Sequence, residues 1–405
     1  MQEAKFAAHL VVEEGDNATP LTPEGWDEAG SGTLLAGIKA NYPTVMQPLT
    51  NPGKEGSPAT EAVLAGAVDD YGMSYYFRGN VENNYVQFAN KCWRIVRVTG
   101  DGSIKLVLHN DNVNNVASPC ASSNNSDDAA FARYSGTTYT TAFNDKRDDN
   151  AYVGFMYGTA GSRTYSETHA NTNKSTILQN LETWYKNNLE LYESKLADTI
   201  WCNDKSTKTN QTLIKASLNT TTNKLDISSG DYPGLGYGTN STFYSGRQRV
   251  RTNYYYTDTS NKKYGSVGTG PTLICPLDND GGKLSKFTVS DTINGNGTLD
   301  YKIGLLTSDE VLYAGSIDYY GYQALNYNNS SINSYLRENS TGAWYWSFSP
   351  NNFDGSTNVL YVGGSGYVRI SWVAYTGGLR PAVSLTSATT ISGGNGTSSS
   401  PFIVN

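Results

Sequence analysis

Two β-hairpins with glycine-rich turns constrain the fold of this chain more than any other feature of its sequence. The first joins residues 92–98 to residues 104–108 across a Gly-Asp-Gly turn, and the second joins residues 359–362 to residues 367–370 across a Gly-Gly-Ser-Gly turn. Glycine readily adopts the positive φ angles of tight turns, and alternating apolar side chains let one face of each strand be buried. We therefore expect sheets in both halves of the chain.

The composition agrees with a chain of strands and loops. Charged residues make up 17% of the 405 residues, while tyrosine and glycine number 30 and 41. An average soluble protein has about 25% charged residues, and coiled coils or helical repeats need Ala, Glu, Lys, Leu and Arg in bulk. Those helical classes are therefore excluded. No apolar run approaches the roughly 18 residues of a membrane-spanning helix.

Two segments carry the pattern of amphipathic helices. The first begins at the N-cap Ser175 and places apolar residues three and four positions apart: Ile177, Leu178, Leu181, Trp184, Tyr185, Tyr192 and Leu196. The second begins at Thr307, where Glu310 completes a capping box, and ends at Gly315. We interpret Asp309 and Glu310 as carboxylates at the positive end of this helix. The expected fold class is α+β, a mixed and β-rich fold with two main helices and long loops.

Four widely spaced cysteines predict two disulfides. The cysteines are Cys92, Cys120, Cys202 and Cys275. None belongs to a CxxC pair or lies near a histidine, which disfavours zinc, although buried thiols in a cytosolic protein would give the same count. Of the three possible pairings we expect the one between sequence neighbours, Cys92–Cys120 and Cys202–Cys275. Disulfides indicate an extracellular or cell-surface location. Met1 is followed by Gln2 and Glu3 instead of a basic and apolar leader, so we expect an export signal that is not present in this chain.

Proline density divides the chain into two parts. Six of the 13 prolines lie within residues 1–66, which we interpret as a proline-rich stem or linker. Residues 67–405 are expected to form one domain.

Several classes of chemistry lack support in the sequence. The net charge is −7 and the basic residues are scattered, so no nucleic-acid partner is expected. Catalytic and nucleotide-binding motifs are missing, and we expect no enzymatic activity and no cofactor. An enzyme of this composition would most resemble a glycosidase with two carboxylates. The run Asp278-Asn279-Asp280-Gly281 resembles the start of a calcium loop, but Val289 stands where the loop needs glutamate, so no metal is expected.

The C-terminal hairpin region has the composition of a binding surface. Tyrosine and tryptophan offer rigid contact area, and small polar residues adapt their hydrogen bonds to a ligand. Valines and leucines between them are expected to anchor the strands to a core; the alternative is that the tyrosines only cover an exposed sheet. The candidate ligand-binding residues are Tyr345, Asn351, Asn352, Asp354, Ser356, Asn358, Tyr361, Ser365, Tyr367, Arg369, Ser371, Trp372 and Tyr375.

Three runs carry a resemblance to a known fold family. They are Ile303 to Glu310, Trp346 to Pro350 and Gly378 to Leu385, in that order and spacing. This arrangement resembles the C-type-lectin-like, formylglycine-generating-enzyme-like fold of bacterial surface proteins, and it is similar to the variable proteins of diversity-generating retroelements. The resemblance covers the chain from about Tyr71 onward. It implies that residues 344–377 form a diversified ligand-binding region.

The same comparison also shows departures from the family. The last cysteine, Cys275, precedes the C-terminal core, so the oxidase activity of the sulfatase-activating members is not implied. The Glu-Pro-Asn and Trp-Asn-Asp motifs of calcium-dependent lectins do not occur. We therefore expect an extracellular bacterial ligand-binding protein, adhesin-like or receptor-like, whose partner is a protein or glycan on another cell or surface. The alternative is a structural subunit of a surface filament or pilus that self-assembles.

Overall fold

The computed structural model of the 405-residue chain describes most of the sequence. The described residues are 22–46, 62–162, 164–207, 213–219, 224–230, 242–250, 255–256, 264–265, 270–276, 284–319 and 332–405. The expected calcium-like run at 278–281 lies outside them, as does most of the expected stem.

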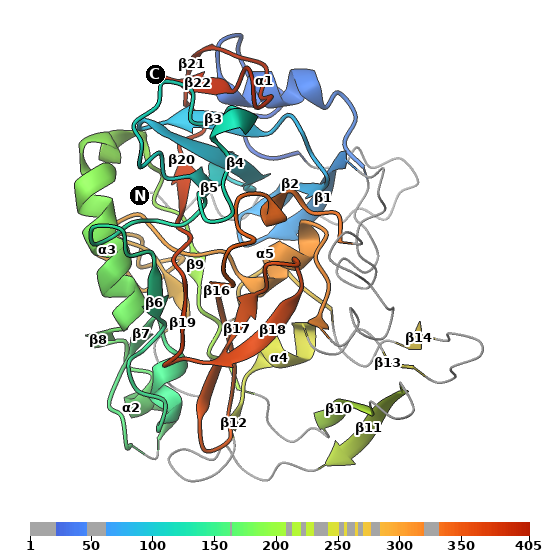
Figure 1. The fold of residues 1–405 in the computed structure, drawn as a ribbon, viewed down its shortest axis with the longest axis vertical. Helices are drawn as coiled ribbons and strands as arrows, with labels where there is room; N and C mark the ends of the chain where they lie inside the picture. Colours follow the sequence, from blue (N-terminus) through green and yellow to red (C-terminus); the bar gives the residue numbers. More distant parts are fainter. Residues whose placement is uncertain are drawn as a thin grey trace, which may run out of the picture.

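A branched sheet joins the first described strands to the end of the chain (Figure 1). Its strands follow the order β1-β2-β4-β3-β22-β21, and β5 links β4 to β20. Their bounds are β1 Ala62–Asp69, β2 Gly72–Gly79, β3 Tyr85–Phe88, β4 Lys91–Val98, β5 Ile104–Asn110, β20 Ala382–Leu385, β21 Ile391–Gly393 and β22 Phe402–Val404. The predicted first hairpin is confirmed as β4–β5, with Gly102 at a φ of 77° in its turn.

A second sheet follows the order β18-β17-β16-β19-β6, with β12 also paired to β16. Its strands are β6 Thr140–Ala142, β12 Thr242–Phe243, β16 Tyr345–Phe353, β17 Thr357–Val362, β18 Val368–Trp372 and β19 Thr376–Gly378. The predicted second hairpin is confirmed as β17–β18, with Gly366 at a φ of 89°. Pro350 lies inside β16, where the register shifts, because proline cannot donate to a regular ladder.

Short strand pairs, five α-helices and four short 3-10 helices (Ser122–Asn124, Asn150–Val153, Glu190–Lys195 and Tyr335–Arg337) complete the described elements. The pairs are β7 Met156–Tyr157 with β8 Asn173–Lys174, β9 Trp201–Cys202 with β15 Lys286–Phe287, β10 Leu213–Asn219 with β11 Lys224–Gly230, and β13 Tyr255–Tyr256 with β14 Tyr264–Gly265. The helices are α1 Leu34–Asn41, α2 Tyr165–Thr168, α3 Thr176–Asn188, α4 Ser245–Val250 and α5 Ser308–Tyr313. The chain is thus β-rich with few helices, as the expected α+β class requires.

Helix α3 confirms the first predicted helix over most of its length. Ser175 Oγ accepts a hydrogen bond from the amide of Leu178 at 3.3 Å, and the Trp184 ring packs 6.2 Å from Trp93 of β4. The helix ends at Asn188 because Asn187 and Asn188 are poor helix formers, so Tyr192 lies beyond it and is 38% exposed. Figure 1 shows α3 running along one side of both sheets.

Helix α5 confirms the predicted capping box. Thr307 Oγ1 accepts from the Glu310 amide, and the Glu310 carboxylate accepts from the Thr307 amide, each at 3.0 Å. Gly315 follows the helix with a φ of 112°, a left-handed conformation that suits glycine.

The expectation that residues 1–66 form a stem is wrong for the part that the structure describes. Helix α1, capped by Thr33, packs Leu34, Leu35 and Ile38 into the main core, and Trp26 stacks edge-on against Tyr75 at 4.9 Å. Proline frequency did not reveal this segment because its apolar residues, spaced for a helix, lie between the prolines. Strand β1 also begins at Ala62, before the expected boundary at residue 67.

Both predicted disulfides are confirmed. Cys92–Cys120 and Cys202–Cys275 are bonded across 28 and 73 residues. Chain-entropy models assign about 3.5 and about 4.5 kcal/mol of stabilisation to closed loops of this size. Among the described residues, no helix is long and apolar enough to cross a membrane.

Candidate ligand-binding surface

The β17–β18 hairpin is firmly anchored in the core. Val359, Leu360, Val362 and Val368 are all at most 1% exposed. Burying one such side chain contributes about 1.5–3 kcal/mol, so this set holds the hairpin in one position. The large side chains between the anchors are therefore displayed by a rigid element.

Tyr361, Tyr367 and Arg369 gather on one side of this hairpin, together with Tyr319 and Trp344, and we call this group the arginine–tyrosine face. Tyr361 and Arg369 are direct cross-strand partners. The Arg369 guanidinium lies 4.1 Å from the centre of the Tyr319 ring, which is itself 4.9 Å from the Tyr367 ring. Burial raises the pKa of Tyr361 to about 12, so its hydroxyl stays protonated at neutral pH. Arg369 is exposed, while Tyr361 and Tyr367 are half-buried.

Trp372, Tyr375 and Arg147 form a second group, which we call the tryptophan corner. Trp372 and Tyr375 are 37% and 51% exposed, and their rings lie 5.2 Å apart. The Arg147 guanidinium lies 3.8 Å from the centre of the Trp372 ring. The Arg147 carbonyl accepts from the Thr357 amide at 2.8 Å, which fixes the arginine segment to the start of β17.

The alternation of β18 separates these two groups. Arg369 pairs with Tyr361 and Trp372 pairs with Asn358, so the arginine and the tryptophan belong to opposite faces of the hairpin. The predicted residues that reach the surface of β18 therefore belong to two separate groups rather than to one continuous surface. In the same register Tyr367, Arg369 and Ser371 alternate with Val368 and Ile370 and so belong to one face of β18.

Four of the predicted ligand-binding residues are buried, so their side chains are not displayed on the surface as expected. Tyr345, Asn351, Asn352 and Asn358 are between 0% and 5% exposed. They lie on β16 and β17, which are covered on both sides, so their side chains make internal contacts: the Tyr345 ring lies 6.2 Å from the Phe131 ring, and Asn358 Nδ2 donates to the Ser356 carbonyl at 2.9 Å. Of the remaining predicted residues, Ser356, Ser365 and Ser371 are half-buried, and Asp354 is exposed in the β16–β17 turn.

Sequence reasoning missed Tyr319 and Arg147, which help to form the two groups, and it did not name Trp344 individually although this residue begins the predicted region 344–377. Trp344 contacts the Tyr361 ring at 4.8 Å and covers Gly377, where an added Cβ would lie 2.3 Å from the indole. The Gly377-Gly378 pair was a signal that a large ring passes close to the backbone there. Nothing in the local sequence links Arg147 or Tyr319 to the hairpin, because these contacts join distant parts of the chain.

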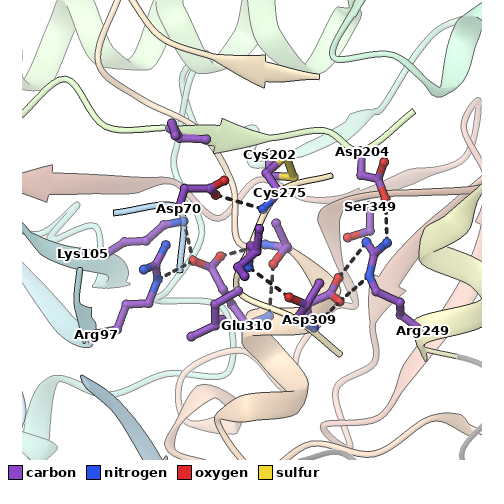
Figure 2. Close-up of a pocket in the computed structure, with 15 residues that line it drawn as sticks. Asp70, Arg97, Lys105, Cys202, Asp204, Arg249, Cys275, Asp309, Glu310 and Ser349 are labelled. Atoms are coloured by element: carbon purple, nitrogen blue, oxygen red, sulfur yellow. Dashed lines mark hydrogen bonds and ion pairs between the residues drawn. A yellow bond between two sulfur atoms is a disulfide. The ribbon is translucent and has the colours of Figure 1, made fainter. Parts of the chain in front are cut away.

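A second cluster of functional groups is buried at the N-terminal end of helix α5 (Figure 2). Lys105 Nζ donates to Glu310 Oε1 at 2.6 Å, and Arg97 joins the same carboxylate at 3.1 Å while also bonding Asp69. Burial by itself would raise the pKa of Glu310, but Lys105 and Arg97 outweigh it and lower the pKa to about 2. The helix-end interpretation of this carboxylate was therefore incomplete.

Asp309 belongs to a neighbouring group in the same cluster. Arg249 donates to Asp309 at 2.8 Å and to Asp204 at 2.6 Å. The cavity between these groups measures about 20 Å³, close to the volume of a single water site. We conclude that the cluster joins helices α4 and α5 to the first sheet and leaves no room for a substrate.

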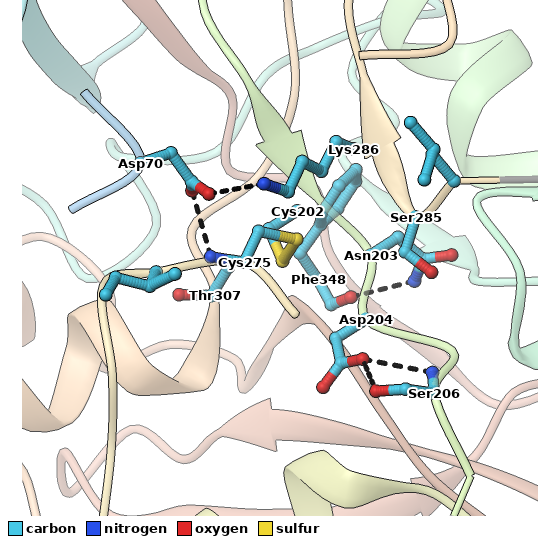
Figure 3. Close-up of a disulfide and its surroundings, with 12 residues drawn as sticks. Asp70, Cys202, Asn203, Asp204, Ser206, Cys275, Ser285, Lys286, Thr307 and Phe348 are labelled. Atoms are coloured by element: carbon cyan, nitrogen blue, oxygen red, sulfur yellow. Dashed lines mark hydrogen bonds and ion pairs between the residues drawn. A yellow bond between two sulfur atoms is a disulfide. The ribbon is translucent and has the colours of Figure 1, made fainter. Parts of the chain in front are cut away.

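The Cys202–Cys275 disulfide closes one side of this cavity (Figure 3). Asp70 accepts from the Cys275 amide at 2.9 Å and from Lys286 Nζ at 2.6 Å. The disulfide and this ion pair thus hold β9, β15 and the end of β1 together. Within the part of the chain that the structure describes, no group of three or more His, Cys, Asp or Glu side chains could hold a metal ion.

No known protein family, curated protein or solved structure matches this chain. Its function is therefore inferred from its own residues.

Proposed function

We propose that this chain is an extracellular or cell-surface ligand-binding protein that contacts a protein or glycan on another surface through its C-terminal hairpin. The observation that carries the proposal is the tryptophan corner, where an exposed Trp–Tyr pair and an arginine are displayed at the end of a buried hairpin. Trp, Tyr and Arg are the residues most enriched among the energetic centres of interfaces. The two disulfides support a location in an oxidising compartment.

The finer features of the proposal rest on the sequence resemblance. We propose a C-type-lectin-like fold for residues 67–405 and a diversified surface within residues 344–377. One structural feature supports a surface whose exposed residues vary while its buried residues stay constant. The hairpin anchors are buried valines and leucines, so substitution at exposed positions such as Arg369, Trp372 and Tyr375 leaves the core unchanged.

Alanine variants of the two groups test this function. R369A removes the charge of the arginine–tyrosine face, and W372A/Y375A removes the tryptophan corner. Labelled protein is applied to glycan arrays and to cell surfaces. Because truncating a central interface residue costs about 2 kcal/mol or more, attachment should fall about thirtyfold, while the stability of each variant changes by less than about 1 kcal/mol.

Y192A serves as the matched control, because Tyr192 is an aromatic residue of similar exposure, 38%, that lies in the segment after α3 and not in the hairpin. Attachment of Y192A should equal that of the wild type. Attachment that survives both hairpin variants in folded protein would rule out the hairpin as the binding site.

A second candidate function, a subunit of a surface filament or pilus, has one observation in its favour. Strand β18 pairs with β17 on one side, and on its other side the described residues provide only an isolated bridge between Asp318 and Val368. An open strand edge is a template for adding a strand from another copy. Light scattering over a range of protein concentrations separates the two functions, since a constant monomer mass excludes self-assembly.

A further inference from the structure

We propose a second binding site, for a neutral saccharide, in a polar groove between the loops that follow β5 and precede β6. The groove has a volume of about 370 Å³, within the range of about 300–1,000 Å³ that small-molecule sites occupy. It is lined by residues between Asn110 and Arg133, so it shares no residue with the hairpin region 344–377.

The walls of the groove are held in place before any ligand binds. The Cys92–Cys120 disulfide ties one wall to β4, and Asn110 Nδ2 crosses the floor to the carbonyls of Pro119 and Asn124, each at 3.0 Å. Asn112 Nδ2 donates to the Val116 carbonyl at 3.0 Å. A preformed site loses little conformational entropy on binding, which favours a small ligand.

The charges at the groove are already neutralised by one another. Asp111 accepts from Lys91 Nζ at 2.8 Å and from the Trp184 indole at 3.0 Å, and Arg133 pairs with Asp128 at 2.9 Å. A charged ligand could pair with Asp111 or Arg133 only by displacing the partners that these side chains already have. The lining therefore selects an uncharged ligand.

The exposed groups of the groove fit a sugar. Among the described residues, the side chains of Asn114 and Ser123 make no hydrogen bond and are exposed at the rim. An amide and a hydroxyl both donate and accept, which matches the hydroxyls of a saccharide. Val113, 60% exposed, and Val116 supply the apolar contact that the C–H face of a sugar ring needs.

Blocking the rim tests this site in the full-length protein. The probes are glucose, galactose, N-acetylglucosamine, N-acetylgalactosamine and lactose at millimolar concentration, and binding is followed by saturation-transfer NMR. N114W and S123W each fill the groove from one wall. N187W is the matched control, because Asn187 is an exposed asparagine on α3.

We expect at least one of these saccharides to bind the wild type and N187W, and to lose affinity by about tenfold or more in N114W and S123W. The hairpin variants R369A and W372A/Y375A should keep this binding, so the test is independent of the function proposed for the hairpin. The inference is overturned if no probe saccharide binds, if both groove variants bind as well as N187W while folded, or if the saccharide is lost in the hairpin variants instead.

Discussion

At the scale of single residues, Glu310 lies at the centre of a group of buried ion pairs. Its carboxylate accepts a hydrogen bond from the Thr307 amide, and it also pairs with Lys105 and Arg97. All three charged side chains are at most 9% exposed. Removing one member of a buried ion pair leaves an uncompensated charge, which costs about 3–5 kcal/mol.

Glu310→Gln should therefore destabilise the protein by about 3–5 kcal/mol at pH 7, as measured by urea unfolding. Glutamine keeps an oxygen for the Thr307 amide, so the loss reports the charge. The stabilisation that results from this lowered pKa is fully present above about pH 4.5 and is lost as the pH falls toward about 2. The difference in unfolding free energy between variant and wild type should therefore shrink over that pH range. E190Q, on the exposed surface, should change stability by less than about 0.5 kcal/mol. Equal effects of the two substitutions would contradict the ion-pair account.

At the scale of elements, the short strand β19 decides where the aromatic groups lie. It pairs with both β16 and β6, and its Gly377 allows the Trp344 ring to lie directly on the backbone. The same ring contacts Tyr361, so the arginine–tyrosine face depends on this close approach.

Gly377→Ala should displace the Trp344 ring and destabilise the protein by about 1–3 kcal/mol, the usual cost of overpacking. It should also change the near-ultraviolet circular dichroism, because a tryptophan moves relative to a tyrosine. Gly393→Ala is the matched control, since Gly393 also lies in a short strand and its added Cβ would meet nothing within 4 Å. A G377A variant as stable as G393A would show that the close contact is not needed.

At the scale of the whole molecule, two buried histidines connect stability to pH. Asn339 Nδ2 donates to His109 Nε2 at 3.2 Å, and the Tyr244 hydroxyl shares a hydrogen bond with His169 Nε2 at 3.2 Å. Burial, and then the nearby charges of Arg94 and Arg380 for His109 and of Lys205 for His169, lower both pKa values well below 6.5.

The free energy of unfolding should therefore change little between about pH 7 and about pH 9 through these groups, and it should fall below about pH 6.5, because only the unfolded chain then binds protons at these histidines. The slope should reach about 1.4 kcal/mol per pH unit for each histidine. H109Q/H169Q should flatten this slope between pH 7 and pH 5, whatever its effect on stability at pH 7. A wild-type stability that does not change between pH 7 and pH 5 would contradict this prediction. Urea unfolding at several pH values measures the slope for the wild type and for the variant.

Much of the secondary structure and both disulfides could be predicted from the sequence alone. The two hairpins, the caps at Ser175 and Thr307 and the cysteine pairs are encoded by residues close together in the chain, or by a small number of possible pairings. Turn and cap chemistry acts over three or four residues, so a local pattern contains the whole signal.

The tertiary structure alone decided which candidate residues reach the surface. Asn351 and Asn352 have the composition of a binding loop, but β16 lies between β17, β12 and β19 and buries them. The partners of Glu310 and Asp309, the packing of residues 22–46 and the contact of Arg147 with Trp372 all join segments far apart in the chain. Such contacts depend on how distant segments pack together, and the period of a single strand shows only that it has two faces, not which of them will be covered.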